Sequence, residues 1–149
     1  MQNYVEGMAA DYEPSPWEPI ADHVERYMDS DGADGAEWEG TQVILLGTIG
    51  RKTGKLRRTP LIRVADGDDY LVVASMGGAD VHPNWYLNLV DNPEVTIQDH
   101  AVVHKMIART ASTEEKAARW AAAVKMWPDY ESYEAATERD IPLVICSPA

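Results

Sequence analysis

Residues 45–61 read LLGTIGRKTGKLRRTPL, a glycine-rich basic turn between two apolar runs. The pattern predicts a strand, a tight turn and a second strand, around which we expect the rest of the chain to be organised. The turn holds five of the thirteen Lys and Arg residues of the chain: Arg51, Lys52, Lys55, Arg57 and Arg58. Removing these five charges from the net charge of −12 leaves −17 on all other residues. A cationic turn in so acidic a protein is explained if it binds an anion through backbone N–H groups and cationic side chains.

The basic turn has a second interpretation, because basic side chains at hairpin tips and sheet edges also protect against aggregation. Charge alone does not decide between the two. The turn is not a P-loop, which places four residues between its glycines and continues through Lys and Ser or Thr into a helix. Here Gly50 and Gly54 are separated by three residues, and an extended segment follows.

Length and composition are typical of one globular domain. The chain has 149 residues, of which 45% are hydrophobic, and no run approaches the roughly 18 apolar residues of a membrane span, so no stable membrane insertion is expected. Cys146 is the single cysteine, which excludes an internal disulfide and makes a cytoplasmic location the default expectation. The negative net charge argues against general nucleic-acid binding. The four histidines lack the spacing and cysteine partners of a metal site, so no metal is expected.

The hydrophobic pattern predicts helices towards both ends of the chain and strands between them. A loosely ordered arm is expected at residues 1–16, then a helix at 17–28 and a glycine-rich loop at 29–40. Strands are expected at 41–48, 57–64, 70–75, 94–98, 102–109 and 141–146. The fourth and fifth of these form a hairpin that turns at Asp99 and His100, and a short helix at 82–90 precedes them.

Two helices are expected before the last strand. The first begins at a capping box, Ser112-Thr113-Glu114-Glu115, and carries Trp120, Val124 and Trp127 on one face. The second follows Pro128 and places Tyr130 and Tyr133 on one face. Together the elements predict an α+β protein in which about six strands close into a small barrel. Residues 1–40 would form the N-terminal arm and helix, and residues 41–149 the barrel domain.

Neither a nucleophile nor a paired acid and base stands out in the sequence. A G-x-S-x-G motif is missing, and Cys146 lies in an apolar run that predicts a buried, unreactive thiol. Such a chain can still be an enzyme if a bound cofactor carries the reaction. Two aromatic groups, Trp85-Tyr86 and Trp127 with Tyr130 and Tyr133, suit a flat ligand, although core packing is the commoner role of such residues.

Three segments of the chain together resemble the deazaflavin-dependent nitroreductase family. They read GRKTGKLRRTPL, DGDDYLVVASMGGADVHPNWYLNLVDNPEVTIQ and MWPDYESYEAATERDIPLVIC. The resemblance extends from about Val43 to Cys146, with matching order and spacing. It implies a split β-barrel of the flavin-reductase or FMN-binding type with flanking helices. It also implies the activity of the actinobacterial members, which transfer hydride from reduced coenzyme F420 to quinones, nitroaromatics or other electron-poor acceptors.

The resemblance further implies roles for individual residues. The phosphate and polyglutamate tail of F420 would be held by Arg51, Lys52 and Thr53, with added charge-assisted contacts from Arg57 and Arg58. The deazaflavin ring would be lined by Thr59, Pro60, Leu61, Ile62, Val73, Ala74, Ser75, Met76 and Tyr130. Its other side would be closed by Asn84, Trp85, Tyr86, Leu87 and Asn88. The substrate wall would consist of Trp127, Tyr130 and Tyr133, where Ser75 would hydrogen-bond the acceptor and a tyrosine could donate a proton.

Two features depart from the family pattern. Met76 stands where many members have Lys before the double glycine, which removes a cation beside the ring and affects the substrate range. Residues 1–40 hold eleven acids and a single basic residue, Arg26, so an anionic membrane should repel them. Two alternatives stay open: an FMN-binding split-barrel flavoprotein, for which five cations exceed the need of one phosphate, and a non-catalytic F420 carrier. Both a monomer and a homodimer fit the sequence.

Overall fold

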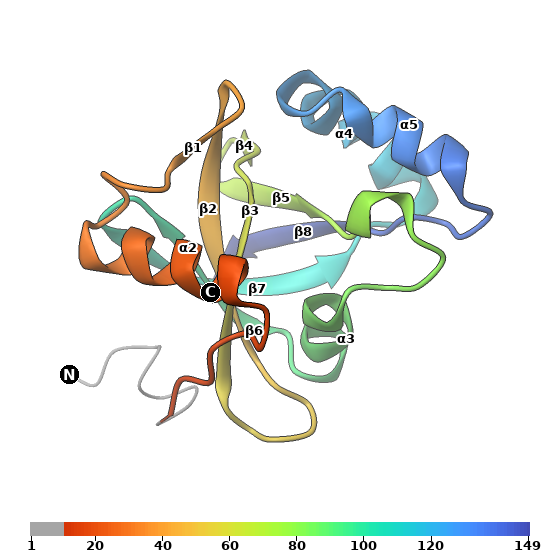
Figure 1. The fold of residues 1–149 in the computed structure, drawn as a ribbon. Helices are drawn as coiled ribbons and strands as arrows, with labels where there is room; N and C mark the ends of the chain where they lie inside the picture. Colours follow the sequence, from red (N-terminus) through yellow and green to blue (C-terminus); the bar gives the residue numbers. More distant parts are fainter. Residues whose placement is uncertain (1–10) are drawn as a thin grey trace.

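The computed structural model describes residues 11–149, so most of the arm expected at residues 1–16 lies outside the described residues. One antiparallel sheet forms the centre of the molecule (Figure 1). Its strands are β1 (Glu37–Trp38), β2 (Thr41–Ile49), β3 (Leu56–Ile62), β4 (Ala65–Asp66), β5 (Asp69–Val73), β6 (Glu94–Asp99), β7 (Val102–Thr110) and β8 (Leu143–Pro148). The helices are α2 (Glu18–Asp29), α3 (Asn84–Asp91), α4 (Thr113–Met126) and α5 (Asp129–Ala136), with a 3₁₀ turn, η1 (Met76–Gly78), after β5.

The sheet curls into a split barrel because one bent segment links its two ends. The strand order is β1-β2-β6-β7-β8-β5-β4, and β3 pairs with β2. Residues 56–66 contain both β3 and β4. β3 pairs with β2 from Leu56↔Ile49 to Ile62↔Val43, and beyond a bend β4 pairs with β5. The six long strands confirm the expected barrel, and the split lies between β3 and β5, which share no ladder among the described strands.

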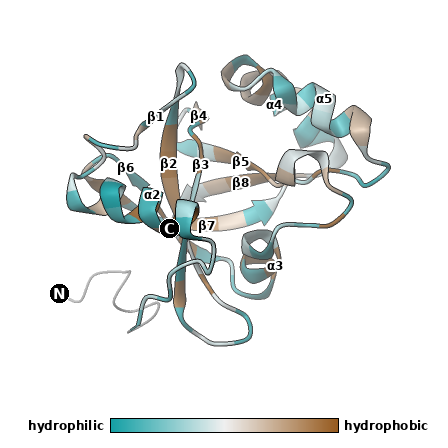
Figure 2. Cartoon of the chain, in the orientation of Figure 1, coloured by the Kyte–Doolittle hydropathy of each residue, from teal (hydrophilic) through white to brown (hydrophobic). Residues whose placement is uncertain are grey.

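Three apolar clusters attach the helices to the barrel. One cluster fills the barrel interior and includes Trp85 and Leu89 of α3. A second packs α4 and α5 against β5 and β8, and a third packs Val24 and Tyr27 of α2 against Leu45 of β2. Figure 2 shows the same division, with apolar strands at the centre and more polar helices around them. β2 is buried almost throughout because it lies between α2 and the barrel interior, as its continuous apolar run predicted.

The β6–β7 hairpin turns one residue later than predicted. Asp99 pairs with Val102, so the turn consists of His100 and Ala101 rather than Asp99 and His100. His100 adopts a φ of 56°, in the left-handed region that such two-residue turns require. The ladder therefore extends through Asp99, which the sequence pattern had assigned to the turn.

α4 begins at the predicted capping box but ends before Trp127. The Oγ of Ser112 accepts a hydrogen bond from the Glu115 N–H at 3.1 Å, and the Glu115 carboxylate accepts one from the Ser112 N–H at 3.0 Å. Trp127, expected on the face of this helix, is its C-cap, with φ −144° and ψ 88°. Pro128 explains the difference, because a residue before proline disfavours the helical conformation. The indole is thereby free to face the cavity described below.

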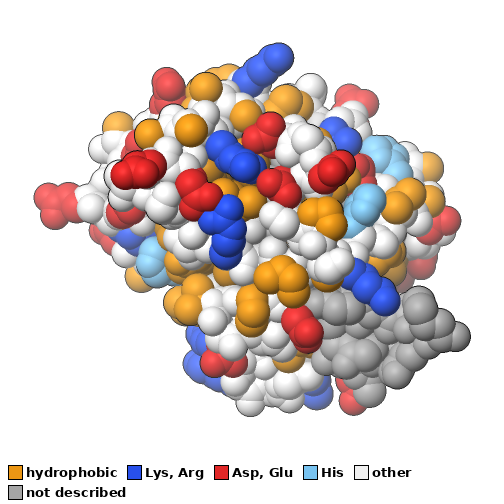
Figure 3. Space-filling view, turned by 180° about the vertical axis from the view of Figure 1, so that it is seen from behind, with side chains coloured by type: hydrophobic (Ala, Val, Ile, Leu, Met, Phe, Trp, Pro, Cys, Tyr) orange, Lys and Arg blue, Asp and Glu red, His pale blue; other side chains and the backbone are white. Residues whose placement is uncertain are grey.

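The surface mixes charges of both signs. On the face shown in Figure 3, acidic, basic and apolar side chains alternate without a large region of one sign. Within residues 11–149, no helix is long and apolar enough to cross a bilayer. Against this mixed surface, the cluster of cations in the β2–β3 turn is a distinct local feature.

Candidate functional site

Two neighbouring cavities lie beside the split of the barrel. One has a volume of about 470 Å³ and is mainly apolar; we call it the apolar compartment. The other has a volume of about 570 Å³ and includes the basic turn; we call it the basic compartment. Four residues line both: Ile20, Thr59, Met76 and Trp85. The two compartments therefore form one groove, with an apolar and a cationic part.

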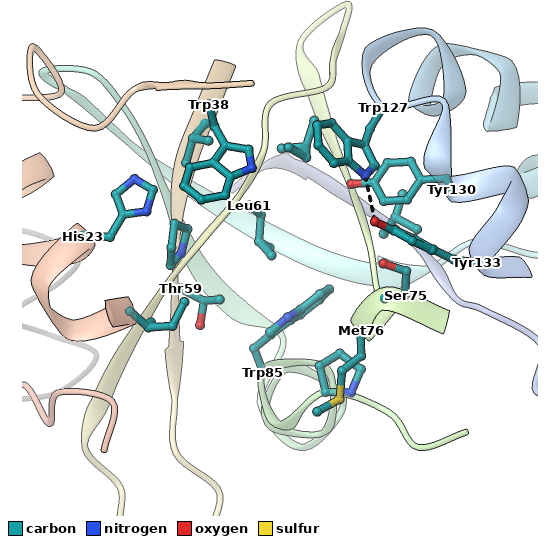
Figure 4. A pocket seen from close by; sticks show the side chains of 17 residues that line it. His23, Trp38, Thr59, Leu61, Ser75, Met76, Trp85, Trp127, Tyr130 and Tyr133 are labelled. Atoms are coloured by element: carbon teal, nitrogen blue, oxygen red, sulfur yellow. Dashed lines mark hydrogen bonds between the residues drawn. The ribbon is translucent and has the colours of Figure 1, made fainter. Parts of the chain in front are cut away.

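Aromatic side chains form two walls of the apolar compartment (Figure 4). His23 and Trp38 lie on one side, across β3 from Trp127 and the tyrosines of α5. The Nε2–H of His23 donates a hydrogen bond to the Gly35 carbonyl at 2.7 Å, and its ring stacks on Trp38 with centroids 6.0 Å apart. These contacts fix the position of Trp38 although its side chain is half exposed.

The opposite wall is held together by contacts among its own members. The indole Nε1–H of Trp127 donates a hydrogen bond to the Tyr133 hydroxyl at 3.3 Å. The rings of Tyr130 and Tyr133 meet edge to face, with centroids 6.1 Å apart. Burial, and secondarily the neighbouring Tyr133, raise the pKa of Tyr130 above its ordinary value. Tyr130 is therefore a neutral phenol at physiological pH, which can donate a hydrogen bond.

The turn after β5, residues 74–79, brings Ser75 into the same compartment, and we call it the Ser75 turn. Met76, Gly77 and Gly78 all have positive φ angles, of 48°, 65° and 84°. At Met76 this conformation costs about 1–2 kcal/mol, because the side chain clashes with the backbone there. Gly78 packs directly on α5, where a Cβ would lie 3.0 Å from the carbonyl oxygen of Tyr133. The glycine at this position allows the Ser75 turn to lie close against the aromatic wall.

Arg51 is the most firmly held cation of the basic compartment. Its backbone N–H and its Nη1 both donate to the Asn88 Oδ1, at 3.1 and 2.9 Å, and its Nη2 donates to the Asn84 Oδ1 at 3.3 Å. The two asparagines are one helical turn apart on α3, so their side chains share a face. Asn88 is itself oriented by donating to the Thr48 Oγ1 at 3.3 Å. These partners are uncharged, so they orient the guanidinium without neutralising it.

A short N-terminal segment closes the basic compartment. The Leu56 N–H at the start of β3 donates to the Asp11 carbonyl at 2.8 Å, and the Glu13 N–H donates to the Leu56 carbonyl at 2.9 Å. Arg58 consequently lies over the Tyr12 ring, 4.7 Å from its centroid, a cation–π contact. Arg57 donates to the Glu13 carboxylate at 3.1 Å. An acidic side chain of the protein thus occupies part of the region where the sequence predicted an anion.

Most of the predicted site residues lie together in this groove. The basic compartment is lined by Arg51, Lys52, Thr53, Arg57, Arg58, Asn84 and Asn88. The apolar compartment is lined by Thr59, Pro60, Leu61, Ile62, Val73, Ser75, Met76, Trp85, Trp127, Tyr130 and Tyr133. Their individual roles stay predictions. Ala74, Tyr86 and Leu87 line neither compartment: Ala74 is fully buried, and the Tyr86 hydroxyl is 2.8 Å from the Thr110 Oγ1 instead.

The sequence patterns did not indicate that the N-terminal quarter of the chain contributes to the groove. The lining residues from that region are Glu13, Ser15, Pro16, Trp17, Ile20, His23 and Trp38. Ile20 belongs to the helically spaced apolar residues that predicted a packed helix at 17–28. That spacing does not distinguish a helix that only covers a sheet from one that also borders a cavity. Trp38 lies in a glycine-rich segment without periodicity, so no local pattern indicated its place.

Known proteins share this fold and much of this sequence. Residues 20–148 match the family model for the F420H(2)-dependent quinone reductase. The F420H(2)-dependent quinone reductase Rv1261c of Mycobacterium tuberculosis is 36% identical over 105 residues, which cover 68% of this chain and 70% of that protein. A solved F420-H2 dependent reductase, FDR-A, superposes with a TM-score of 0.67 at 40% identity, over 70% of this chain and 93% of that one.

A second solved structure, described as a domain-swapped dimer, superposes with a TM-score of 0.70 at 36% identity, over 89% of this chain and all of that one. The family match spans the whole barrel together with most of α2, and the resemblance drawn from the sequence motifs is confirmed by it. The chain therefore belongs to the F420H(2)-dependent quinone reductase family.

Proposed function

We propose that this protein is an F420H2-dependent oxidoreductase that passes hydride to a quinone. The observation that supports this best is the junction of an aromatic compartment and a cationic compartment in one groove. F420 has a flat deazaflavin ring and an anionic tail with a phosphodiester and glutamates, so each part meets a compartment of matching chemistry. When bound, the reduced cofactor supplies the hydride, and the protein supplies binding, orientation and exclusion of water.

The residues of the chain divide this work between the two compartments. Arg51 and Arg58 would bind anionic groups of the tail, each contact contributing about 1.5–3 kcal/mol. Residues 59–62 of β3 would present an apolar surface to the ring, while Trp85 borders both compartments. Ser75 would hydrogen-bond the acceptor beside the aromatic wall. Catalysis would come mainly from holding the two reactants at close range in a site that excludes water.

The tyrosines of α5 are expected to supply the proton that a quinone needs after it has accepted hydride. The double variant Tyr130→Phe/Tyr133→Phe should lower kcat for quinone reduction by about 100-fold, a typical general-acid contribution. The F420 dissociation constant should change little. Steady-state oxidation of F420H2 by menadione measures kcat, and fluorescence titration measures the F420 dissociation constant. Tyr86→Phe is the matched control, because its hydroxyl bonds Thr110 outside the groove. An unchanged kcat in the double variant would mean that solvent provides the proton.

Glu13 is expected to compete with the anionic tail for Arg57. Glu13→Gln should therefore tighten F420 binding by about two- to fivefold, since a partly exposed ion pair of this kind is worth up to about 1 kcal/mol. Fluorescence titration with F420 measures the affinity of each variant. The control is Glu114→Gln, which removes the same charge from an exposed position on α4. Equal affinities in the two variants would show that Glu13 does not compete.

A titration of the purified protein with oxidised F420, at low and high salt, tests the proposed function directly. We expect saturable fluorescence changes whose dissociation constant rises with salt, because the tail would bind to cations. F420H2 added to the complex should then be oxidised by menadione. Purified protein that carries FMN, or that does not bind F420, would contradict the proposal. Bound F420H2 that no quinone oxidises would point to a carrier.

A further inference from the structure

We propose that Arg139 is the positioning residue of the apolar compartment, which holds the Ser75 turn against the aromatic wall without touching the acceptor. The proposal rests on the proposed function, since it takes this compartment as the place where the acceptor is reduced. Arg139 follows the end of α5 and is not among the residues that line either compartment. Its effect on the reaction would therefore be indirect.

One guanidinium makes four hydrogen bonds, three of them to the backbone of the Ser75 turn. The Nε of Arg139 donates to the Ala79 carbonyl at 3.0 Å, and Nη2 donates to the Ser75 carbonyl at 2.9 Å. Nη1 donates both to the Ala74 carbonyl at 3.0 Å and to the Nδ1 of His82 at 2.9 Å. These bonds join the end of β5, the η1 turn and the entrance to α3. Because the donors of a guanidinium form a rigid planar fork, no other side chain could satisfy the same set.

The acceptors of Arg139 indicate a clamp on the backbone rather than an ion pair. Three are carbonyl oxygens, and the fourth is an unprotonated imidazole nitrogen, so all four are uncharged. The segment that they hold contains the strained Met76, with its φ of 48°. A backbone in this region persists only where the surroundings hold it in place. The guanidinium supplies much of that restraint.

Two further contacts keep the turn and α5 at the same spacing. Thr137, two residues before Arg139, donates a hydrogen bond from its Oγ1 to the Asp80 carboxylate at 2.7 Å. Gly78 packs against the backbone of Tyr133, as described above. Ser75 and the tyrosines of α5 are thus held at a fixed spacing. Of the residues described here, Arg139 makes the most hydrogen bonds to the Ser75 turn. A displacement of about 1 Å between reacting groups can cost about 100-fold in rate.

Arg139→Gln is expected to lower kcat/KM for menadione by about 10- to 100-fold, with a dissociation constant for F420 within about twofold of wild type. The reason is that the cations of the basic compartment come from the β2–β3 turn and the start of β3, whereas the hydrogen bonds of Arg139 go to residues 74–82. Arg119→Gln is the matched control. Arg119 is partly buried like Arg139 and bonds Asp69 at 3.0 Å, but it lies on α4 away from the groove. Its loss should lower the melting temperature without lowering kcat/KM.

A second readout does not depend on activity. Burial and the nearby Arg139 lower the pKa of His82 below its ordinary value. In Arg139→Gln the cation is removed, so the pKa of His82, followed by NMR of the imidazole, should rise. A general loss of packing elsewhere in the molecule would not produce this change, and Arg119→Gln should leave the His82 titration unaltered.

Three results would overturn the proposal. The first is a kcat/KM in Arg139→Gln within about twofold of wild type, and the second is an equal loss in Arg119→Gln. The third is a pKa of His82 that stays constant in Arg139→Gln. A wild-type protein that neither binds F420 nor reduces quinones would contradict the proposed function instead. In that case the His82 titration still tests whether Arg139 lies against His82, beside the turn.

Discussion

The double variant Arg51→Ala/Arg58→Ala is expected to bind F420 about 10²- to 10⁴-fold more weakly than the wild type. Each guanidinium would make a charge-assisted contact worth about 1.5–3 kcal/mol, and two such contacts correspond to this range of dissociation constants. Both side chains are already oriented, Arg51 by Asn84 and Asn88 and Arg58 by the ring of Tyr12. Little conformational entropy would therefore be lost on binding, which favours large contributions.

The control for this prediction is Lys55→Ala/Lys125→Ala, which removes the same total charge. Lys55 is exposed in the same turn but is not part of the basic compartment, and Lys125 is exposed on α4. We expect this control to weaken binding by no more than a few fold, and the effect should vanish at high salt. Fluorescence titration at two salt concentrations separates the two variants. A loss of affinity that depended only on net charge would contradict the assignment of the tail to the basic compartment.

Gly32→Ala is expected to lower the free energy of unfolding by about 2–5 kcal/mol. Gly32 has a φ of +84°, where a side chain costs about 1–2 kcal/mol. An added Cβ would also lie 2.6 Å from the Cα of His100, so the backbone would have to move, at a further cost of about 1–3 kcal/mol. The N–H of Gly32 donates to the Tyr27 carbonyl at 2.9 Å, so the shift would reach α2.

Gly40→Ala provides a close control for the steric part of this loss. Gly40 has nearly the same φ, +81°, but among residues 11–149, its two chain neighbours aside, no heavy atom lies within 4 Å of the position that an added Cβ would occupy. Its substitution should therefore cost only the conformational term of about 1–2 kcal/mol. Urea unfolding of both variants measures the difference. Equal losses would show that the loop at Gly32 relaxes freely and does not hold α2 against the barrel.

The barrel could be predicted from the sequence because its signals are local. The apolar run of β2, the turn at residues 66–69 and the capping box at Ser112 each depend on neighbouring residues, and each element formed where it was expected. The differences were small and have local causes. Trp127 left its helix because Pro128 follows it, and the β6–β7 turn moved by one residue because Asp99 completes the ladder.

The groove was less accessible to prediction because it is built from distant parts of the chain. The residues of the basic turn were found through their unusual charge, and those of the aromatic wall through their clustering, with their role as a substrate wall implied by the family resemblance. Glu13 and Trp38 carry neither signal, and only the folded chain brings them to β3. Arg139 is similar: its partners lie 57 to 65 residues earlier, and nothing in its local sequence distinguishes it from a surface arginine.

The unequal bonding of β3 has a consequence for the energetics of the ligand-free protein. One edge of this strand is paired with β2 along seven residues, whereas the other meets the N-terminal segment at Leu56 and then borders the groove. A strand supported on one side opens locally at a smaller free-energy cost than a central strand. A bound cofactor would act as the missing neighbour of this edge. Variants that bind the cofactor more weakly should therefore also show less protection of the β3 amides from hydrogen exchange when the cofactor is present.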